Sequence, residues 1–137
     1  MSLGYKTNGE QISFEAGEDM VEPYVFVVAG STAGQVVFQA ASTSVATPVI
    51  GCIQNSASSG EAVNVQLSGV TKAVAGAAIG IGARVHVGSI DGRIDDDEDG
   101  TVGAVCVGIA LEAATAAGQI ISVLINCPAV AEDGGSS

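Results

Sequence analysis

Few residues of this 137-residue chain could do chemistry, and its single histidine is the first to consider. His86 alternates with Val85 and Val87 in a stretch typical of a β-strand, and neither a nucleophile nor a carboxylate stands beside it in the sequence. A general base needs such a partner within hydrogen-bond reach. The serines and threonines cluster in loop-like segments without a G-x-S-x-G elbow. We therefore expect no catalysis and no enzyme.

The three cysteines, Cys52, Cys106 and Cys127, do not have the spacing of a metal site. Each lies among apolar residues, where cysteine usually behaves as a small hydrophobic side chain. A catalytic couple between His86 and Cys106 would need an activated thiol, whereas burial raises the pKa of a thiol and makes it inert. We predict three buried free thiols and no cofactor.

The segment 91–100, DGRIDDDEDG, is the most acidic part of the chain. Asp95, Asp97 and Asp99 reproduce the start of a calcium-loop pattern, but Cys106 occupies the twelfth position, where a bidentate glutamate is needed. One interpretation is a solvated acidic turn, because like charges repel one another into water. The other is weak binding of a divalent ion by these three aspartates.

Charge and hydropathy exclude several classes of partner. The Gly-rich segment 75–83, AGAAIGIGA, lacks the Lys and Ser/Thr of a phosphate-binding loop, so nucleotide binding is not expected. Four basic residues face fifteen acidic ones, and the net charge of −11 should repel nucleic acid. Glycine and polar residues interrupt every apolar run before about 18 residues, so no membrane span is expected. Residues 1–19 do not resemble a signal peptide, and we expect a soluble protein made in a cytoplasm.

The elements that would position these residues are strands. Short runs of Val, Ile and Ala, cut by Gly-rich or acidic turns, predict an all-β fold, a small antiparallel β-sandwich or barrel with an extended N-terminal arm. We expect consecutive strands to be antiparallel neighbours, with Asp91-Gly92 as the strongest hairpin signal and Gly51 as a bulge or a close backbone approach. The predicted strands cover residues 22–29, 35–40, 49–54, 62–67, 84–87, 104–111 and 119–127, with 69–73 as a continuation of the fourth.

The chain divides into an arm at 1–19, a β domain at 20–127 and a polar tail at 128–137. The arm has too few apolar residues to fold alone. Tyr5 and Phe14 either pin it to a neighbouring surface or pack it back on its own domain. No aromatic residue follows Phe38, so small aliphatic side chains must fill most of the core.

The segment Gly69 to Ile125 resembles phage capsid decoration or cement proteins, a group of small prophage head proteins. The resemblance lies in Gly69-Val70, in the run AGAAIGIGARV at 75–85 and in the run GIALEAA at 108–114. It implies a β-rich protein that binds an assembled capsid, often as trimers at points where shell subunits meet. An acidic protein should avoid packaged DNA, which agrees with a place on the outside of the shell.

We therefore expect a noncatalytic structural protein that binds the outer surface of a phage capsid and stabilises the shell. Its partners would be the major capsid protein and further copies of itself, with a homotrimer as the expected oligomer. It would be made in the host cytoplasm and reside on the virion. Tyr5, Phe14 and Tyr24 are the expected contact residues. The alternative is a head fibre or spike-type module that binds a receptor or a carbohydrate.

Overall fold

The computed structural model describes residues 10–38, 48–87, 92–96 and 105–127, in which it contains ten strands and no helix. The predicted all-β fold is confirmed, and these residues include no helix that could cross a membrane. The strands are β1 (Gln11–Ala16), β2 (Phe26–Ala29), β3 (Gln35–Val37), β4 (Val49–Ile53), β5 (Ala62–Gln66), β6 (Ser68–Val74), β7 (Arg84–Val87), β8 (Ile94–Asp95), β9 (Val105–Ala110) and β10 (Ile120–Asn126).

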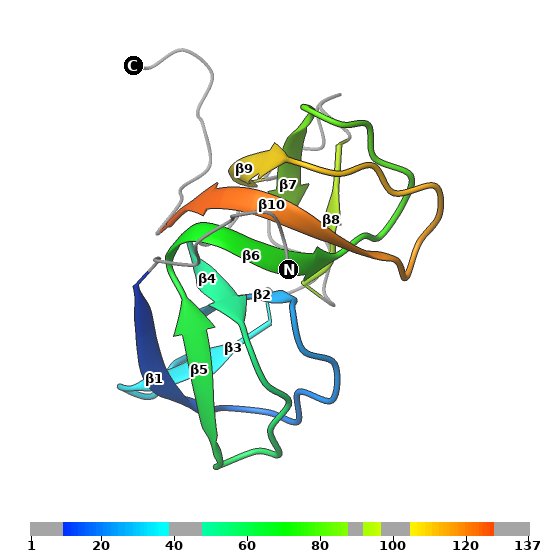
Figure 1. Cartoon of the computed structure of the whole chain (residues 1–137). Coiled ribbons are helices and arrows are strands. Elements are labelled where there is room, and N and C mark those ends of the chain that lie inside the picture. Colours follow the sequence, from blue (N-terminus) through cyan, green and yellow to red (C-terminus); the bar gives the residue numbers. More distant parts are fainter. Residues whose placement is uncertain (1–9, 39–47, 88–91, 97–104, 128–137) are drawn as a thin grey trace.

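The first five strands form a closed barrel in the order β1-β3-β2-β4-β5. In Figure 1 it occupies the lower half of the molecule. β5 pairs antiparallel with β1, from Gln11 opposite Gln66 to Glu15 opposite Ala62. The other side of β1 pairs with β3 in parallel, which closes the circle.

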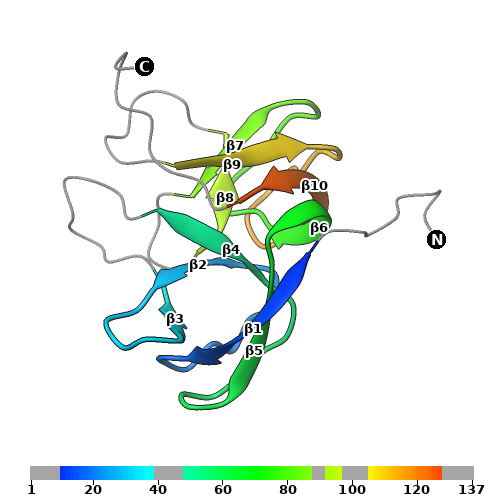
Figure 2. The same ribbon diagram turned by 90° about the vertical axis from the view of Figure 1, so that its left-hand side faces the viewer.

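The other five strands form a second sheet in the order β6-β10-β9-β7-β8. Figures 1 and 2 show this sheet packed above the barrel. β6 and β10 pair along their whole lengths, from Val74 opposite Ile120 to Ser68 opposite Asn126. A parallel bridge between Ala75 and Ile94 brings the two edges of the sheet together, so the sheet curls into a half-barrel with a concave and a convex face.

Two hydrophobic cores hold these units. One lies inside the barrel, and the other lies between the barrel wall and the concave face of the second sheet. β2 serves both, because Val27 packs in the barrel core while Phe26 packs in the second core. A strand covered on both faces needs apolar residues at successive positions, which explains the run of buried residues in β2. The second core consists otherwise of small aliphatic and Cys residues, as the aromatic-poor sequence predicted.

The structure corrects the predicted extent of the arm. Residues 11–16 form β1 and belong to the barrel, so this part of the segment packs on its own domain, one of the two alternatives left open. The register explains why, since Phe14 lies opposite Val63 and packs against the barrel core. Residues 1–9 and the tail at 128–137 lie outside the described residues, and their roles stay predictions.

The strands themselves were predicted more accurately than their order. All the predicted strands are found within a few residues, whereas β1 and the two-residue β8 were missed. Among the predicted strands, the expectation that consecutive strands pair is right for β2 with β3, β4 with β5, β7 with β9 and β9 with β10. It is wrong for β3 and β4, because β2 lies between them, and for β6, which follows β5 after one residue but pairs with β10.

Gly51 was expected to be a bulge or a close approach, and it is both. The register between β2 and β4 shifts next to it, because Val27 lies opposite Gly51 and Val28 opposite Val49. A Cβ at Gly51 would collide with the carbonyl oxygen of Gln66 on β5. Only glycine lets the two backbones approach so closely.

Candidate binding surface

The convex face of the second sheet carries a row of apolar side chains across three strands. Leu124 at the centre of β10 lies opposite Val70 on β6 and Ile109 on β9. Directly opposed residues of antiparallel strands point to the same face, with Cβ atoms about 5 Å apart. Leu124 is 46% exposed and Ile109 43% exposed, and Val70 is half-buried. We call Val70, Leu124 and Ile109 the apolar row.

The alternation along β10 explains how these side chains reach the surface. Ile121, Val123 and Ile125 point into the second core and are almost completely buried. The intervening positions therefore point outward, and two of them are the exposed Ile120 and Leu124. A sheet with one solvated face usually carries polar residues at these outward positions. Several large aliphatic residues on neighbouring strands therefore mark a surface suited to contact with another molecule.

Two cations border the apolar row. Arg84 on β7 lies opposite Ile109 and continues the row, and Lys72 lies two residues along β6 from Val70, roughly 7 Å away. Both are exposed, and neither forms an ion pair with a described residue. Glu112 lies at the border of this face, where its Oε1 accepts a hydrogen bond from the backbone N–H of Ser122 at 2.8 Å.

Charge is divided unequally between the barrel and the second sheet. The described barrel segments, 10–38 and 48–66, contain six acidic residues and no Lys or Arg. The remaining described segments hold three cations and three acids. Of these cations, Arg93 forms a two-bond ion pair with Glu22, with Nη2 to Oε2 at 3.0 Å and Nε to Oε1 at 3.2 Å. Lys72 and Arg84 are thus the cations of the described chain that the convex face presents to solvent.

His86 lies on the same face, nearer the end of the sheet. The register places Cys106 and Asp95 opposite it on the two neighbouring strands. The imidazole is 8% exposed, and its Nδ1 is buried without a hydrogen-bond partner. Cys106 Sγ is directed to the carbonyl oxygen of Gly108 at 3.9 Å. Because Nδ1 has no thiol or carboxylate partner, the described geometry does not form a nucleophile–base pair through this nitrogen.

The thiols behave largely as predicted. All three are free, and Cys52 and Cys127 are buried in the second core. Cys106 is only half-buried, so the prediction is wrong for this residue, which lies on the convex side of β9. Burial raises the pKa of Cys52 strongly, against a weaker opposite effect of a hydrogen bond with Thr71, and burial raises the pKa of Cys127 to about 12. Both are neutral, unreactive thiols at physiological pH.

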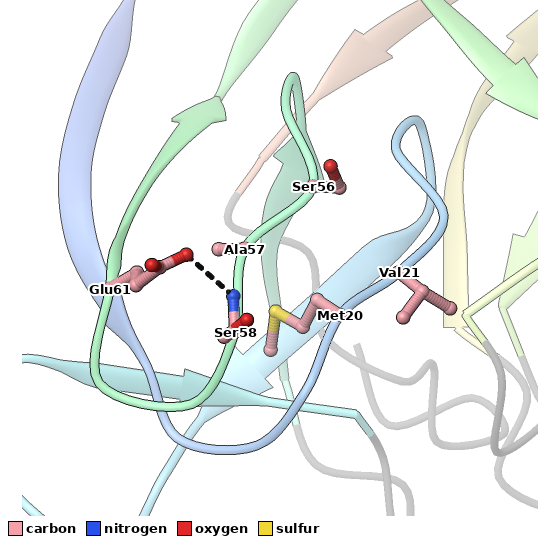
Figure 3. A pocket seen from close by; sticks show the side chains of 6 residues that line it. All are labelled: Met20, Val21, Ser56, Ala57, Ser58 and Glu61. Atoms are coloured by element: carbon pink, nitrogen blue, oxygen red, sulfur yellow. Dashed lines mark hydrogen bonds between the residues drawn. The ribbon is translucent and has the colours of Figure 1, made fainter.

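A shallow hollow at the far end of the barrel does not provide a reactive centre (Figure 3). Its volume is about 210 Å³, below the roughly 300–1,000 Å³ typical of ligand pockets. The one carboxylate in its lining, that of Glu61, accepts a hydrogen bond from the backbone N–H of Ser58 at 2.9 Å. The lining residues are Met20, Val21, Ser56, Ala57, Ser58 and Glu61.

Two of the three residues predicted as contacts lie in the described part of the chain. Phe14 on β1 and Tyr24 before β2 are both half-buried and packed on the cores, and Tyr24 has a positive φ of 68°. Tyr5 lies outside the described residues. The contact role of all three residues stays a prediction.

Asp95, the first of the three predicted metal ligands, lies in β8, and Asp97 and Asp99 lie outside the described residues. Among the residues that are described, no group of three His, Cys, Asp or Glu side chains could hold a metal ion. Calcium binding at this segment stays a prediction.

Sequence reasoning missed the apolar row. Its signal was present in β10, where Ile and Leu occupy alternate outward positions, but an apolar run by itself does not reveal which face is covered. The row becomes visible only when the register aligns Val70, Leu124 and Ile109, which are far apart in the sequence.

The fold defines a small all-β protein with an exposed apolar row on the second sheet. The model of the phage cement protein family matches residues 10–125. The chain therefore belongs to the phage cement protein family, and the predicted resemblance is confirmed. A comparison with curated proteins finds no match.

A solved structure with a similar fold is that of the head fibre gp8.5 N base in bacteriophage phi29. The likeness covers 90% of this chain and 98% of that chain, with a TM-score of 0.60 and 17% sequence identity. At this identity the comparison concerns the fold alone. Membership of a family of structural phage proteins agrees with the expected absence of catalysis.

Proposed function

We propose that this protein binds the outer surface of a phage capsid and stabilises the shell without catalysing a reaction. The observation that carries the proposal is the match of the phage cement protein family over residues 10–125. A cement protein joins or covers subunits of a larger particle, so its function requires a complementary face and no reaction centre. The major capsid protein is the proposed partner.

The charge of the protein supports a place on the outside of the shell. With a net charge of −11, it would be repelled by packaged DNA, which is itself a polyanion. We propose that several copies act together as a small homo-oligomer, with a trimer as the expected state, because weak contacts repeated over a symmetric lattice add up. Synthesis in the host cytoplasm would precede assembly on the finished shell.

Co-sedimentation with capsids tests the proposal. Purified protein is mixed with empty, expanded capsids of the cognate phage and pelleted, with an unrelated acidic protein of similar size as the control. We expect saturable binding and a higher melting temperature of the shell, since a ligand that binds only the assembled state stabilises it. Failure of the full chain to pellet with the capsids would refute capsid binding.

The arm and the aromatic residues belong to the same test. We propose Tyr5, Phe14 and Tyr24 as contact residues, and alanine at Tyr5 is the most direct variant because Phe14 and Tyr24 also pack on the cores. If Tyr5→Ala binds the capsid with unchanged affinity, Tyr5 is not a contact residue.

The second candidate function is that of a head fibre or spike-type module, which the fold of the phi29 head fibre N base favours. Such a module would bind a receptor or a carbohydrate through its loops, with or without calcium at Asp95, Asp97 and Asp99. Binding to host cells together with a calcium-dependent rise in melting temperature of several degrees would support it. Capsid binding in the presence of a chelator would favour the cement function.

A further inference from the structure

We infer that the convex face of β6, β10, β9 and β7 is the surface that docks on the capsid. Its apolar row, Val70, Leu124 and Ile109, and its flanking cations, Lys72 and Arg84, fit a shell surface on which apolar side chains are bordered by Asp or Glu. This inference rests on the proposed function and names the face that performs it.

The apolar row supplies the area to be buried. Leu124 and Ile109 together leave a large aliphatic surface in water, and their neighbours on the same face do not cover it. Burying such surface against a partner is favourable by roughly 25 cal/mol per Å². A rigid sheet also holds these side chains in fixed register, so little conformational entropy is lost on docking.

The cations indicate the chemistry of the partner. The barrel is acidic throughout its described segments, so it would be repelled by an acidic surface. Lys72 and Arg84 are exposed at the two sides of the apolar row and are not neutralised by a described ion pair. Charges at the rim of an apolar patch select a partner of opposite sign and speed its association. The partner surface should therefore carry carboxylates at the positions that face them.

A second copy of the same face is a poor occupant. If two convex faces packed on each other around a twofold axis, each would bring Lys72 and Arg84 to the contact. Among the described residues, the acids near this face are Glu112 at its border, whose carboxylate is engaged with Ser122, and Asp95 near the end of the sheet. Within the described part of the face, four cations would thus meet like charges, which costs affinity. A shell surface of opposite charge does not have this problem.

Four variants test the face in the capsid co-sedimentation assay. Leu124→Glu and Ile109→Glu place a charge in the apolar row, and Lys72→Glu and Arg84→Glu reverse its flanking charges. The matched controls are Val21→Glu in the barrel and Ile81→Glu in the turn before β7, two aliphatic residues that are 85% and 73% exposed. Circular dichroism and light scattering on each variant report fold and oligomer mass.

We expect each of the four variants to weaken capsid binding roughly tenfold or more, with fold and oligomer mass unchanged, and the two controls to bind like the wild type. Binding of the Lys72 and Arg84 variants should also lose most of its dependence on salt. The inference is overturned if all four variants bind like the wild type while the wild type still pellets, an outcome that leaves capsid binding intact through another face. It is also overturned if Leu124→Glu changes the oligomer mass, because the row would then join copies of this chain. Failure of the wild type itself would instead remove the proposed function.

Discussion

The side chain of Gln66 holds the backbone of Val70. Its Nε2 donates hydrogen bonds at 2.9 Å to the carbonyl oxygen of Val70 and, equally, to that of Ser68. Gln66 is the last residue of the barrel strand β5, and the two carbonyls belong to β6, the first strand of the second sheet. The amide is 2% exposed. One buried side chain therefore fixes the turn by which the chain passes from one unit to the other.

Replacing this amide should destabilise the turn between β5 and β6. We expect Gln66→Met to lower the free energy of unfolding by about 1–3 kcal/mol, because two part-buried carbonyl oxygens lose their donor. The same substitution at the exposed Gln119, Gln119→Met, is the control; it removes hydrogen bonds with Thr115 in a solvent-exposed loop and should change the stability by less than about 1 kcal/mol. Urea denaturation at neutral pH measures both. Equal stabilities of the two variants would contradict a structural role of the Gln66 amide.

Gly108 is required where β9 meets β10. A Cβ at this position would collide with the carbonyl oxygen of Leu124, a backbone atom that cannot move aside cheaply. We expect Gly108→Ala to destabilise the fold by roughly 2 kcal/mol or more. Gly80→Ala is the matched control, since a Cβ there meets no other atom within 4 Å. Thermal denaturation followed by circular dichroism should separate the two variants clearly.

The sequence was sufficient to predict the class of fold. Alternation in segments such as Ala62–Gln66 and Arg84–Val87 has a period that only a strand explains, and these strands were found at the expected positions. β1 was missed although its residues, QISFEA, alternate between polar and apolar side chains, because this short pattern lies in a polar segment and four of its six residues are exposed. Its place in the barrel comes from pairing with β5. Pairing partners distant in sequence cannot be read from local periodicity.

Finding the candidate surface depended even more on how strands distant in the sequence are aligned. Leu124 looks like a core residue in the apolar sequence of β10, and only the packing of Ile121, Val123 and Ile125 into the second core shows that it faces outward. The role of Gly51, by contrast, was predicted correctly, because a glycine inside an apolar strand indicates a bulge or a close backbone approach at that position. Such local backbone features can be predicted from a sequence, whereas identifying the face that a partner covers requires the packed structure.

The ion pair between Arg93 and Glu22 connects β8 to the segment before β2. Its two hydrogen bonds, at 3.0 and 3.2 Å, have the forked geometry that favours arginine over lysine. The side chains are 29% and 37% exposed, so solvent screens the pair. A double-mutant cycle with Glu22→Gln and Arg93→Met should give a coupling energy of about 0.5–1 kcal/mol, which decreases in 1 M salt. A coupling of zero at low salt would show that the pair does not stabilise the fold.

The buried thiols should make the fold sensitive to alkaline pH. Burial raises the pKa values of Cys52 and Cys127 above the usual value near 9.0, with that of Cys127 at about 12. Above about pH 9 the unfolded chain loses these protons while the folded chain keeps them. The folded state then binds more protons, so its stability falls as the pH rises between the unfolded and the folded pKa values. Below pH 9 the two thiols contribute no pH dependence.

Substitution of these thiols should therefore change how steeply the free energy of unfolding falls with pH, and not only its value at one pH. Each raised thiol can contribute up to about 1.4 kcal/mol per pH unit between pH 9 and its folded pKa. We expect Cys52→Ala and Cys127→Ala to flatten the loss of stability between pH 9 and 10.5 in urea titrations, even though each leaves a small cavity and lowers the stability at pH 7. Cys106→Ala, at the half-buried thiol outside both cores, is the control for the removal of a thiol as such. If all three variants lose stability with pH as the wild type does, the alkaline transition arises from groups other than the two buried thiols.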